Sequence, residues 1–270
     1  MKIKLICSIV VVHIAFFLWG QNKTDFISPL DIPFSLSGTF GEPRNTHFHL
    51  GIDIKTQGKE GWEVKSISSG HISRIRVSLG GYGKALYIDH PDKTSSVYAH
   101  LKKFGPKIEA YIKSIQYKKE SYTLQQFPKK GELNIAAGEV IGYSGNTGSS
   151  SGPHLHFEIR DTETQMPLNP LLFNLPINDS QRPQIQELFL FYPQKNNSLI
   201  HSEFVLLKKV NDSTYHTPII NSSGKMGLGL RMFDRQDLSY SRNGIYKARV
   251  DINGKTIVLS LIHISEPTRP

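Results

Sequence analysis

Cysteine is almost absent from this 270-residue sequence. The single cysteine, Cys7, lies within the first ten residues, in an apolar segment. A disulfide framework needs several cysteines, so no disulfide can form within the remainder of the chain. Thiol catalysis outside that segment is excluded for the same reason.

Long runs of a single charge are also lacking. The formal net charge is +9, yet no five consecutive residues are Lys or Arg. A basic surface favours anionic partners such as nucleic acid, acidic lipid or an anionic cell-wall polymer. Because no basic block forms a nucleic-acid-binding arm, we expect no nucleic-acid partner. The composition, 38% hydrophobic and 20% charged, is that of a globular protein with one large or two modest domains.

A long apolar run occurs at the N-terminus, over residues 5–19, after Lys2 and Lys4. A basic start followed by about 15 apolar residues is typical of a secretory signal peptide, whereas a membrane span needs about 20. We therefore expect residues 1–20 to be a signal peptide. The protein would then be exported to the periplasm or cell envelope, or released outside the cell. An uncleaved segment would instead attach it to a membrane.

Changes in pattern along the chain predict its domains. Residues 21–35 form a lead-in, and residues 36–178 form a first domain. The pattern breaks at a proline-rich stretch, and alternation resumes over residues 184–259, which predicts an incomplete β-sandwich-like domain. Residues 260–270 resemble a translated sequencing-adaptor fragment, so we expect a non-native tail there.

The expected fold class is all-β, with an antiparallel sheet in the first domain. Short stretches rich in Val, Ile and Tyr alternate with glycine-rich turns, which is typical of antiparallel strands. One stretch, residues 104–132, interrupts this pattern. Its apolar residues Ile108, Tyr111, Ile112 and Ile115 have helical spacing, so it predicts a short amphipathic helix followed by a polar loop. This insertion is expected either to form one wall of a cleft or to be a surface insertion.

Residues 152–160 combine a turn with a strictly alternating strand. Successive side chains of an extended chain point to opposite faces. Leu155, Phe157 and Ile159 therefore share the face that a core would bury, and His154 and His156 share the opposite, polar face. Two imidazoles on one strand face are well placed to build a metal site. A surface strand that carries two histidines by chance would show the same pattern.

Two further stretches place metal-competent residues on one strand face. Residues 47–54 alternate, so His49 and Asp53 share a face, and residues 96–101 do the same for Tyr98 and His100. Three separated strands with such residues point to one shared site.

With these residues in this order, the sequence resembles the M23 family of zinc metallopeptidases, of the lysostaphin and LytM type. The resemblance covers about residues 36–173 and rests on three motifs. These are His49-x-x-x-Asp53, the segment Tyr98-Ala99-His100-Leu101, and a Ser-Gly-Asn-Thr-Gly turn that leads into Gly152-Pro153-His154-Leu155-His156.

The resemblance implies a role for each motif residue. His49, Asp53 and His156 correspond to three ligands of one zinc ion, and His154 and His100 correspond to catalytic histidines that are not ligands. A catalytic zinc site keeps three protein ligands and a position for water, which fits this set. The implied reaction is hydrolysis of peptide bonds in peptidoglycan stem peptides or cross-bridges by attack of metal-bound water. His154 is assigned as the proton acceptor, although which of the two histidines is the base stays open, as does the oligomeric state.

Two alternatives remain open from the sequence. The first is a non-catalytic LytM-like regulator of a cell-wall amidase, and the second is a secreted peptidase that acts on proteins. Other residues near the motifs receive smaller roles. His47 is expected at the surface or behind the ligands, and Glu158 and Arg160 are expected at a solvated edge or in contact with substrate. Some members of the family have a tyrosine upstream of the first ligand that faces the reaction centre, whereas this sequence has Phe40 and no tyrosine there.

Overall fold

The structure is a computed structural model that describes residues 26–44, 47–193, 200–212, 214–220, 225–237, 239–252 and 255–261. The expected signal peptide and residues 262–270 of the expected tail lie outside these ranges. No helix in the described ranges is long and apolar enough to cross a membrane.

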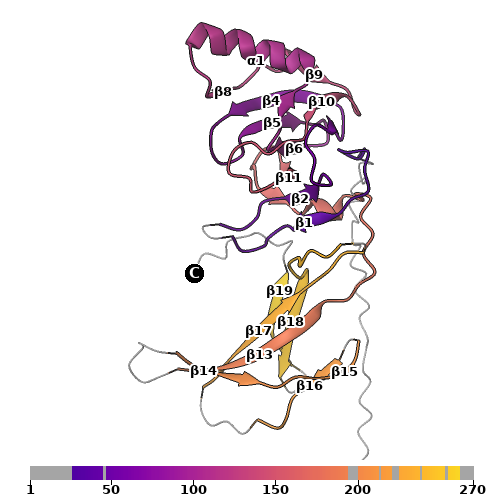
Figure 1. The fold of residues 1–270 in the computed structure, drawn as a ribbon, viewed down its shortest axis with the longest axis vertical. Coiled ribbons are helices and arrows are strands. Elements are labelled where there is room, and N and C mark those ends of the chain that lie inside the picture. Colours follow the sequence, from indigo (N-terminus) through magenta and orange to yellow (C-terminus); the bar gives the residue numbers. More distant parts are fainter. Residues whose placement is uncertain are drawn as a thin grey trace, which may run out of the picture.

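The first part of the chain contains one long antiparallel sheet, in the order β1-β2-β11-β6-β5-β4-β8, with β12 beside β11 and β9 beside β4. A smaller sheet has the order β3-β10-β7. The strands are β1 (Leu36–Gly38), β2 (Ile52–Lys55), β3 (Glu63–Lys65), β4 (Gly70–Val77), β5 (Lys84–Asp89), β6 (Thr94–Ala99), β7 (Lys103–Phe104), β8 (Leu124–Gln126), β9 (Asn134–Ile135), β10 (Val140–Tyr143), β11 (His154–Asp161) and β12 (Pro167–Leu168). The helices are α1 (Pro106–Lys119) and the short 3-10 helix η1 (Pro170–Leu172). The expected fold of antiparallel sheets with one α-helix is confirmed (Figure 1).

The alternation of β11 has the predicted consequence. Leu155, Phe157 and Ile159 are fully buried in the main core, between the long sheet and the elements that cover it. Burial of each such side chain contributes about 1.5–3 kcal/mol, so this strand is firmly held. Its opposite face is thereby fixed as the face that carries His154 and His156.

The predicted strand over residues 47–54 is wrong in its first half. Only Ile52–Lys55 pairs as strand β2, and Phe48, expected on the buried face, is 66% exposed. Backbone hydrogen bonds explain the difference: Gly41 N donates to His49 O, and His49 N donates to Glu42 O, each at 2.8 Å. These bonds hold His49 against Gly41 and Glu42, outside the strand and just before the start of β2.

The insertion forms the predicted helix, α1, which buries Ile108 and Ile112 against the core. The following segment is not only loop, because β8 pairs with the edge strand β4. The helix lies at one end of the molecule, with β4, β5 and β6 between it and β2 and β1 (Figure 1).

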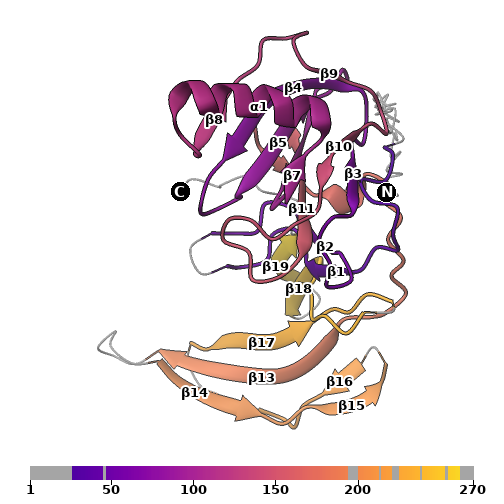
Figure 2. The ribbon, with the colours of Figure 1, turned by 45° about the horizontal axis from the view of Figure 1, so that its top comes forward.

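The C-terminal part of the described chain contains a three-stranded sheet and two hairpins. Its strands are β13 (Gln184–Pro193), β14 (Ile200–Val205), β15 (Lys208–Asn211), β16 (Thr214–His216), β17 (Gly227–Phe233), β18 (Lys247–Ile252) and β19 (Lys255–Leu261). The sheet has the order β14-β13-β17, and the pairs β15-β16 and β18-β19 are antiparallel (Figure 2). Among the described residues, its buried hydrophobic cluster is small and consists of Leu188, Leu190 and Val205. The Asn243-Gly244 pair, which resembles a hairpin turn, instead belongs to a loop that contacts the first part of the chain.

Candidate functional site

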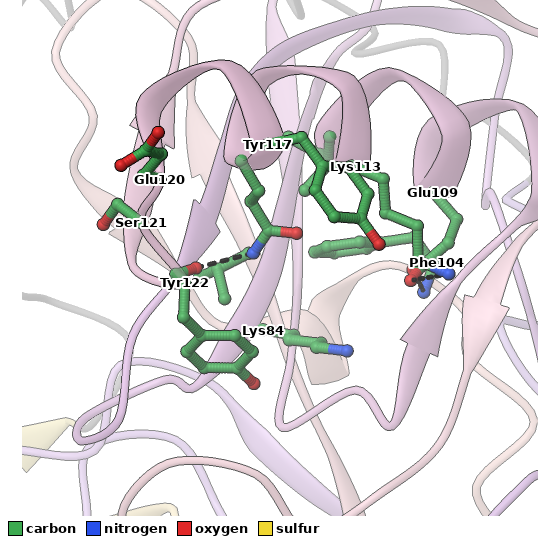
Figure 3. A pocket seen from close by; sticks show the side chains of 11 residues that line it. Lys84, Phe104, Glu109, Lys113, Tyr117, Glu120, Ser121 and Tyr122 are labelled. Carbon is green, nitrogen blue, oxygen red and sulfur yellow. Dashed lines mark hydrogen bonds and ion pairs between the residues drawn. The ribbon is translucent and has the colours of Figure 1, made fainter.

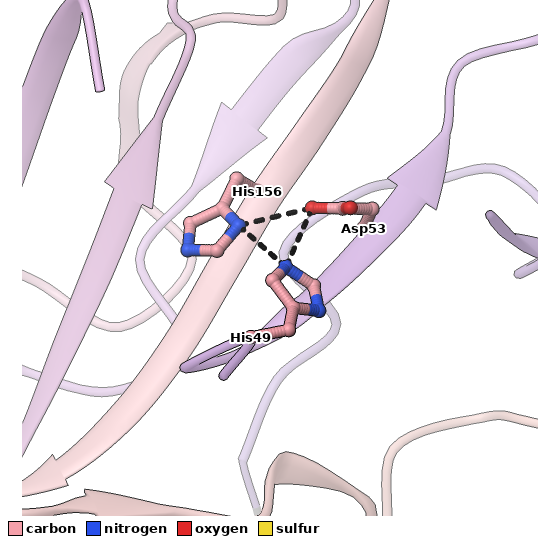
Figure 4. Close-up of side chains that lie close together, drawn as sticks. All are labelled: His49, Asp53 and His156. Carbon is pink, nitrogen blue, oxygen red and sulfur yellow. Dashed lines mark hydrogen bonds and ion pairs between the residues drawn. The ribbon is translucent and has the colours of Figure 1, made fainter. Parts of the chain in front are cut away.

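Three side chains from two neighbouring strands and one loop meet on the polar face of the long sheet (Figure 4). β11 and β2 are antiparallel and in register, so His156 lies directly opposite Asp53. His49 comes from the loop before β2. Gly51 lets this segment approach β11 closely, because a Cβ there would lie 2.2 Å from the carbonyl oxygen of Phe157.

The three donor atoms are close enough to share one metal ion. His49 Nε2 lies 3.1 Å from both Asp53 Oδ1 and His156 Nδ1, and the last two atoms are 2.9 Å apart. Ligands of a tetrahedral zinc ion with bonds near 2.05 Å are separated by about 3.3 Å. The cluster could therefore hold a metal ion with only a small outward movement.

The second ring nitrogen of each histidine in the cluster is hydrogen-bonded to an oxygen. His49 Nδ1 donates to the carbonyl oxygen of Thr39 at 2.8 Å, and His156 Nε2 donates to Glu158 Oε1, also at 2.8 Å. A carbonyl or carboxylate oxygen only accepts, so the proton lies on the outer nitrogen of each neutral ring. In the neutral rings the inner nitrogens present lone pairs to the shared position, as in metal-binding histidines. A protonated ring instead donates from its inner nitrogen to Asp53 Oδ1, and a bound metal ion takes the place of that proton.

Electrostatics also favour a cation at this position. Burial raises the pKa of Asp53, but hydrogen bonds with His154, His156 and His49 outweigh burial and hold the pKa far below its usual range. Burial lowers the pKa of His156, yet the carboxylates of Asp53 and Glu158 outweigh it and raise the pKa to about 9. The buried carboxylates therefore attract positive charge to the space between the three side chains.

His100 and His154 lie beside the cluster without joining it. Their ring centroids are 4.8 Å apart, and His154 Nε2 lies 3.4 Å from Asp53 Oδ1. His100 Nδ1 bonds the carbonyl oxygen of Thr147, and His154 Nδ1 bonds that of Gly152, each at 2.8 Å. Both rings therefore keep Nε2 available as a proton acceptor.

The expectation that Tyr98 and His100 share a strand face is wrong. Tyr98 is fully buried in the main core, opposite Phe157, whereas His100 lines the cleft, because the chain turns at the end of β6. The backbone at His100 is unusual. Its φ of 58° is left-handed, a conformation that costs a non-glycine residue about 1 kcal/mol or more and that occurs often at functional sites. The turn comes at the end of β6, where His100 N donates to the carbonyl oxygen of Tyr82. Burial lowers the pKa of His100 to about 4, so its ring is neutral near pH 7.

The expectation for Glu158 is wrong. Instead of a solvated edge, Glu158 is fully buried, and its carboxylate bonds His156, Arg160 and the hydroxyl of Tyr82. The cause is Tyr82, which follows the Gly80-Gly81 turn and lies with its ring 5.1 Å from that of His156. Sequence reasoning missed Tyr82 because no motif marks it, and an aromatic ring between two glycine turns has no periodic signal.

The five predicted site residues all line one open cleft of about 1030 Å³. Its lining also includes Arg44, His47, Tyr82 and the turn residues 149–153. His47 is exposed at this cleft, in agreement with its expected place outside the ligand set. None of residues 104–132 lines it, which decides against the insertion as a wall of this cleft.

Comparison with known proteins finds similarity over the segment that contains this cluster. Residues 47–170 match the family model described as "Peptidase family M23". A DD-carboxypeptidase/endopeptidase, Mpg, from Neisseria meningitidis is 34% identical over 128 residues, which are 47% of this chain and 23% of Mpg. Lysostaphin from Staphylococcus staphylolyticus is 32% identical over 115 residues, 42% of this chain and 19% of lysostaphin.

The catalytic domain of lysostaphin from Staphylococcus simulans has been solved. It aligns with a TM-score of 0.37 at 27% identity, over 52% of this chain and 88% of that domain. The chain spans about a quarter or less of the length of these full-length curated relatives. The matched segment contains His49, Asp53, His100, His154 and His156, and residues 47–170 therefore belong to peptidase family M23.

Proposed function

We propose that this protein is a zinc-dependent endopeptidase that hydrolyses peptide bonds in peptidoglycan stem peptides or cross-bridges. Members of its family are zinc endopeptidases that act on peptidoglycan. One observation carries the proposal: His49 Nε2, Asp53 Oδ1 and His156 Nδ1 converge, while the outer nitrogen of each histidine is bonded to an oxygen. We assign these three residues as the zinc ligands.

A zinc ion bound there supplies Lewis acidity, which activates water and polarises a carbonyl group. The chain itself supplies the proton transfers. His154 Nε2 faces the ligand cluster and accepts a proton from the attacking water, then returns it to the leaving amine. His100 is neutral and donates from Nδ1 to Thr147, so its Nε2 can only accept a hydrogen bond, and it orients the attacking water by accepting one from it.

The charge distribution supports an anionic polymer as substrate. Residues 102–132 hold eight lysines and three acidic residues, and all eight lysines are exposed. A separate groove of about 470 Å³ lies beneath α1, where Lys84 and Lys113 stand near the exposed rings of Tyr117 and Tyr122 (Figure 3). Lys84 is two residues from Tyr82 in the catalytic cleft, so a long substrate that leaves the cleft has a basic surface nearby.

We also propose that the protein is exported through its N-terminal segment, and that it works in the periplasm or cell envelope or outside the cell. Peptidoglycan lies beyond the cytoplasmic membrane, so a hydrolase must cross that membrane to reach it. The basic start and apolar run of residues 1–20 support this proposal.

The decisive experiment incubates the purified protein with isolated sacculi, with and without a zinc chelator, and identifies the released muropeptides by mass spectrometry. We expect new peptide termini in the untreated sample, loss of activity with chelator and recovery with added zinc. A cell-wall amidase regulator would release nothing under any of these conditions. A protein-directed peptidase would leave sacculi intact and cleave an unfolded polypeptide instead. His154→Ala should abolish cleavage while zinc remains bound, because His154 is not a ligand.

A further inference from the structure

Two of the proposed ligands, His49 and Asp53, are each hydrogen-bonded by a residue of the same short segment, residues 39–44. Thr39 accepts the hydrogen bond from His49 Nδ1 through its carbonyl oxygen. Arg44 Nη2 donates to Asp53 Oδ2 at 3.0 Å, which leaves Oδ1 turned towards the two histidines. The geometry of both ligands therefore depends on where residues 39–44 lie.

Glu42 joins these two supports. Its Oε1 accepts two hydrogen bonds from Thr39, one from the backbone N at 2.9 Å and one from Oγ1 at 2.7 Å. Its Oε2 accepts a hydrogen bond from Arg44 Nη2 at 3.3 Å. The side chain of Glu42 is only 15% exposed, and Glu42 does not line the catalytic cleft. Glu42 thus contacts neither ligand but holds the groups that do.

The C-terminal part of the chain reaches the same carboxylate. Gly244 N donates to Glu42 Oε1 at 2.8 Å and lies 3.2 Å from Thr39 Oγ1. Reciprocal backbone hydrogen bonds between Asp234 and Asn243 close the loop that presents Gly244. Within this loop, the buried Gln236 accepts from Leu36 N at 2.9 Å, so β1 is contacted as well.

Gly244 has to be a glycine for this approach. A Cβ added there would lie 2.9 Å from Glu42 Cγ and 3.3 Å from Thr39 Oγ1. A larger side chain would therefore push the loop at residues 234–244 away from Glu42, or displace Glu42 itself.

We propose that Glu42 is a positioning residue that couples the docking of the 234–244 loop to the metal site. This inference rests on the proposed zinc site. When the loop is docked, Glu42 is held in place by Gly244 and in turn fixes Thr39 and Arg44, so His49 and Asp53 are preorganised for the ion. Such coupling is reciprocal, so zinc binding must also stabilise the docked loop.

The test measures zinc affinity by competition with a chromophoric chelator, for the full chain and for three variants. We expect Glu42→Gln and Gly244→Val each to bind zinc about tenfold more weakly, as is common when a residue behind the ligands is lost. The matched control is Gly227→Ala in β17, where a Cβ would make only an ordinary contact, at 3.6 Å from Phe191 Cβ. It should bind zinc like the wild type.

A second measurement needs no variant. Hydrogen exchange of the wild-type protein with and without zinc should show increased protection of residues 234–244 when zinc is added, and this gain should be lost in Glu42→Gln. Equal zinc affinity of all variants, or no zinc-dependent protection of the loop, would overturn the coupling. A wild-type protein that binds no zinc at all would instead overturn the proposed function, so the two failures are distinguishable.

Discussion

Glu158 Oε1 lies 2.8 Å from His156 Nε2, on the same strand and completely away from solvent. A buried carboxylate behind a metal-binding histidine fixes which ring nitrogen carries the proton and raises the basicity of the other. The pair is in turn completed by Arg160 and Tyr82, so none of the carboxylate's charge faces an apolar surface. This relationship makes Glu158 the residue through which His156 is oriented.

Replacement of Glu158 by Gln should therefore weaken zinc binding by about 10- to 100-fold while the fold is retained, because Gln keeps the shape and removes the charge. Zinc affinity measured against a competing chelator is the readout. Glu163→Gln is the matched control, since Glu163 is exposed near the other end of β11. An unchanged affinity in Glu158→Gln would show that the pair does not serve the metal site.

Tyr82→Phe should lower the free energy of unfolding by about 1–2 kcal/mol, because the buried carboxylate of Glu158 loses one hydrogen-bond donor. The ring that packs beside His156 is retained in this variant. Urea unfolding of the zinc-free protein measures the change. A variant as stable as the wild type would mean that the hydroxyl bond contributes nothing to stability.

The contrast between β11 and the loop before β2 explains what sequence could predict. Strict alternation fixed the buried face of β11, and hence the shared face of His154 and His156, because the two-residue period of a strand has no alternative once one face is apolar. Residues 47–50 also alternate, yet they belong to a loop. Backbone hydrogen bonds between His49 and residues 41–42 determine the structure there, and the hydrophobic pattern of a sequence contains no information about such bonds.

The supporting residues of the site were beyond prediction for a similar reason. Glu158 was expected in solvent because it lies on the polar face of β11, and its contacts with Tyr82, His156 and Arg160 reverse this. Glu42 acquires its importance from contacts with Arg44 and with Gly244, which is 202 residues away. Long-range contacts of this kind leave no periodic or local trace in one sequence.

The pH dependence of stability should show the buried state of His100. Its pKa is lowered to about 4 by burial, whereas a solvent-exposed histidine titrates near 6.5. Between these values the unfolded chain binds more protons than the folded one, so this contribution to stability is present above pH 6.5 and is lost as the pH falls towards 4.

We expect the difference in unfolding free energy between the wild type and His100→Asn to shrink by about 2 kcal/mol from pH 7.5 to pH 4.5. Asn tolerates the left-handed backbone at this position, so the comparison isolates the ring. Urea titrations of the zinc-free proteins provide the measurement. A difference that stays constant, or that grows as the pH falls, would contradict the assigned pKa.

The lysines of the insertion should contribute to sacculus binding and not to chemistry. Replacement of Lys118, Lys119, Lys129 and Lys130 by Gln removes four exposed charges that make no ion pair within the described part of the chain. Affinity for sacculi at low salt should fall about tenfold and become less salt-dependent, because screening weakens exposed charges. Hydrolysis of a short soluble peptide fragment of peptidoglycan should be unchanged. An equal loss on both substrates would place these lysines in the catalytic step.

The central claim is that His49, Asp53 and His156 hold one zinc ion. A crystal structure of the zinc-loaded protein, with anomalous diffraction recorded on both sides of the zinc absorption edge, tests it most directly. The account predicts one strong peak about 2 Å from His49 Nε2, Asp53 Oδ1 and His156 Nδ1, with His154 and His100 outside bonding distance. A peak bound to other residues, or a zinc-saturated crystal with no peak among these three side chains, would contradict it.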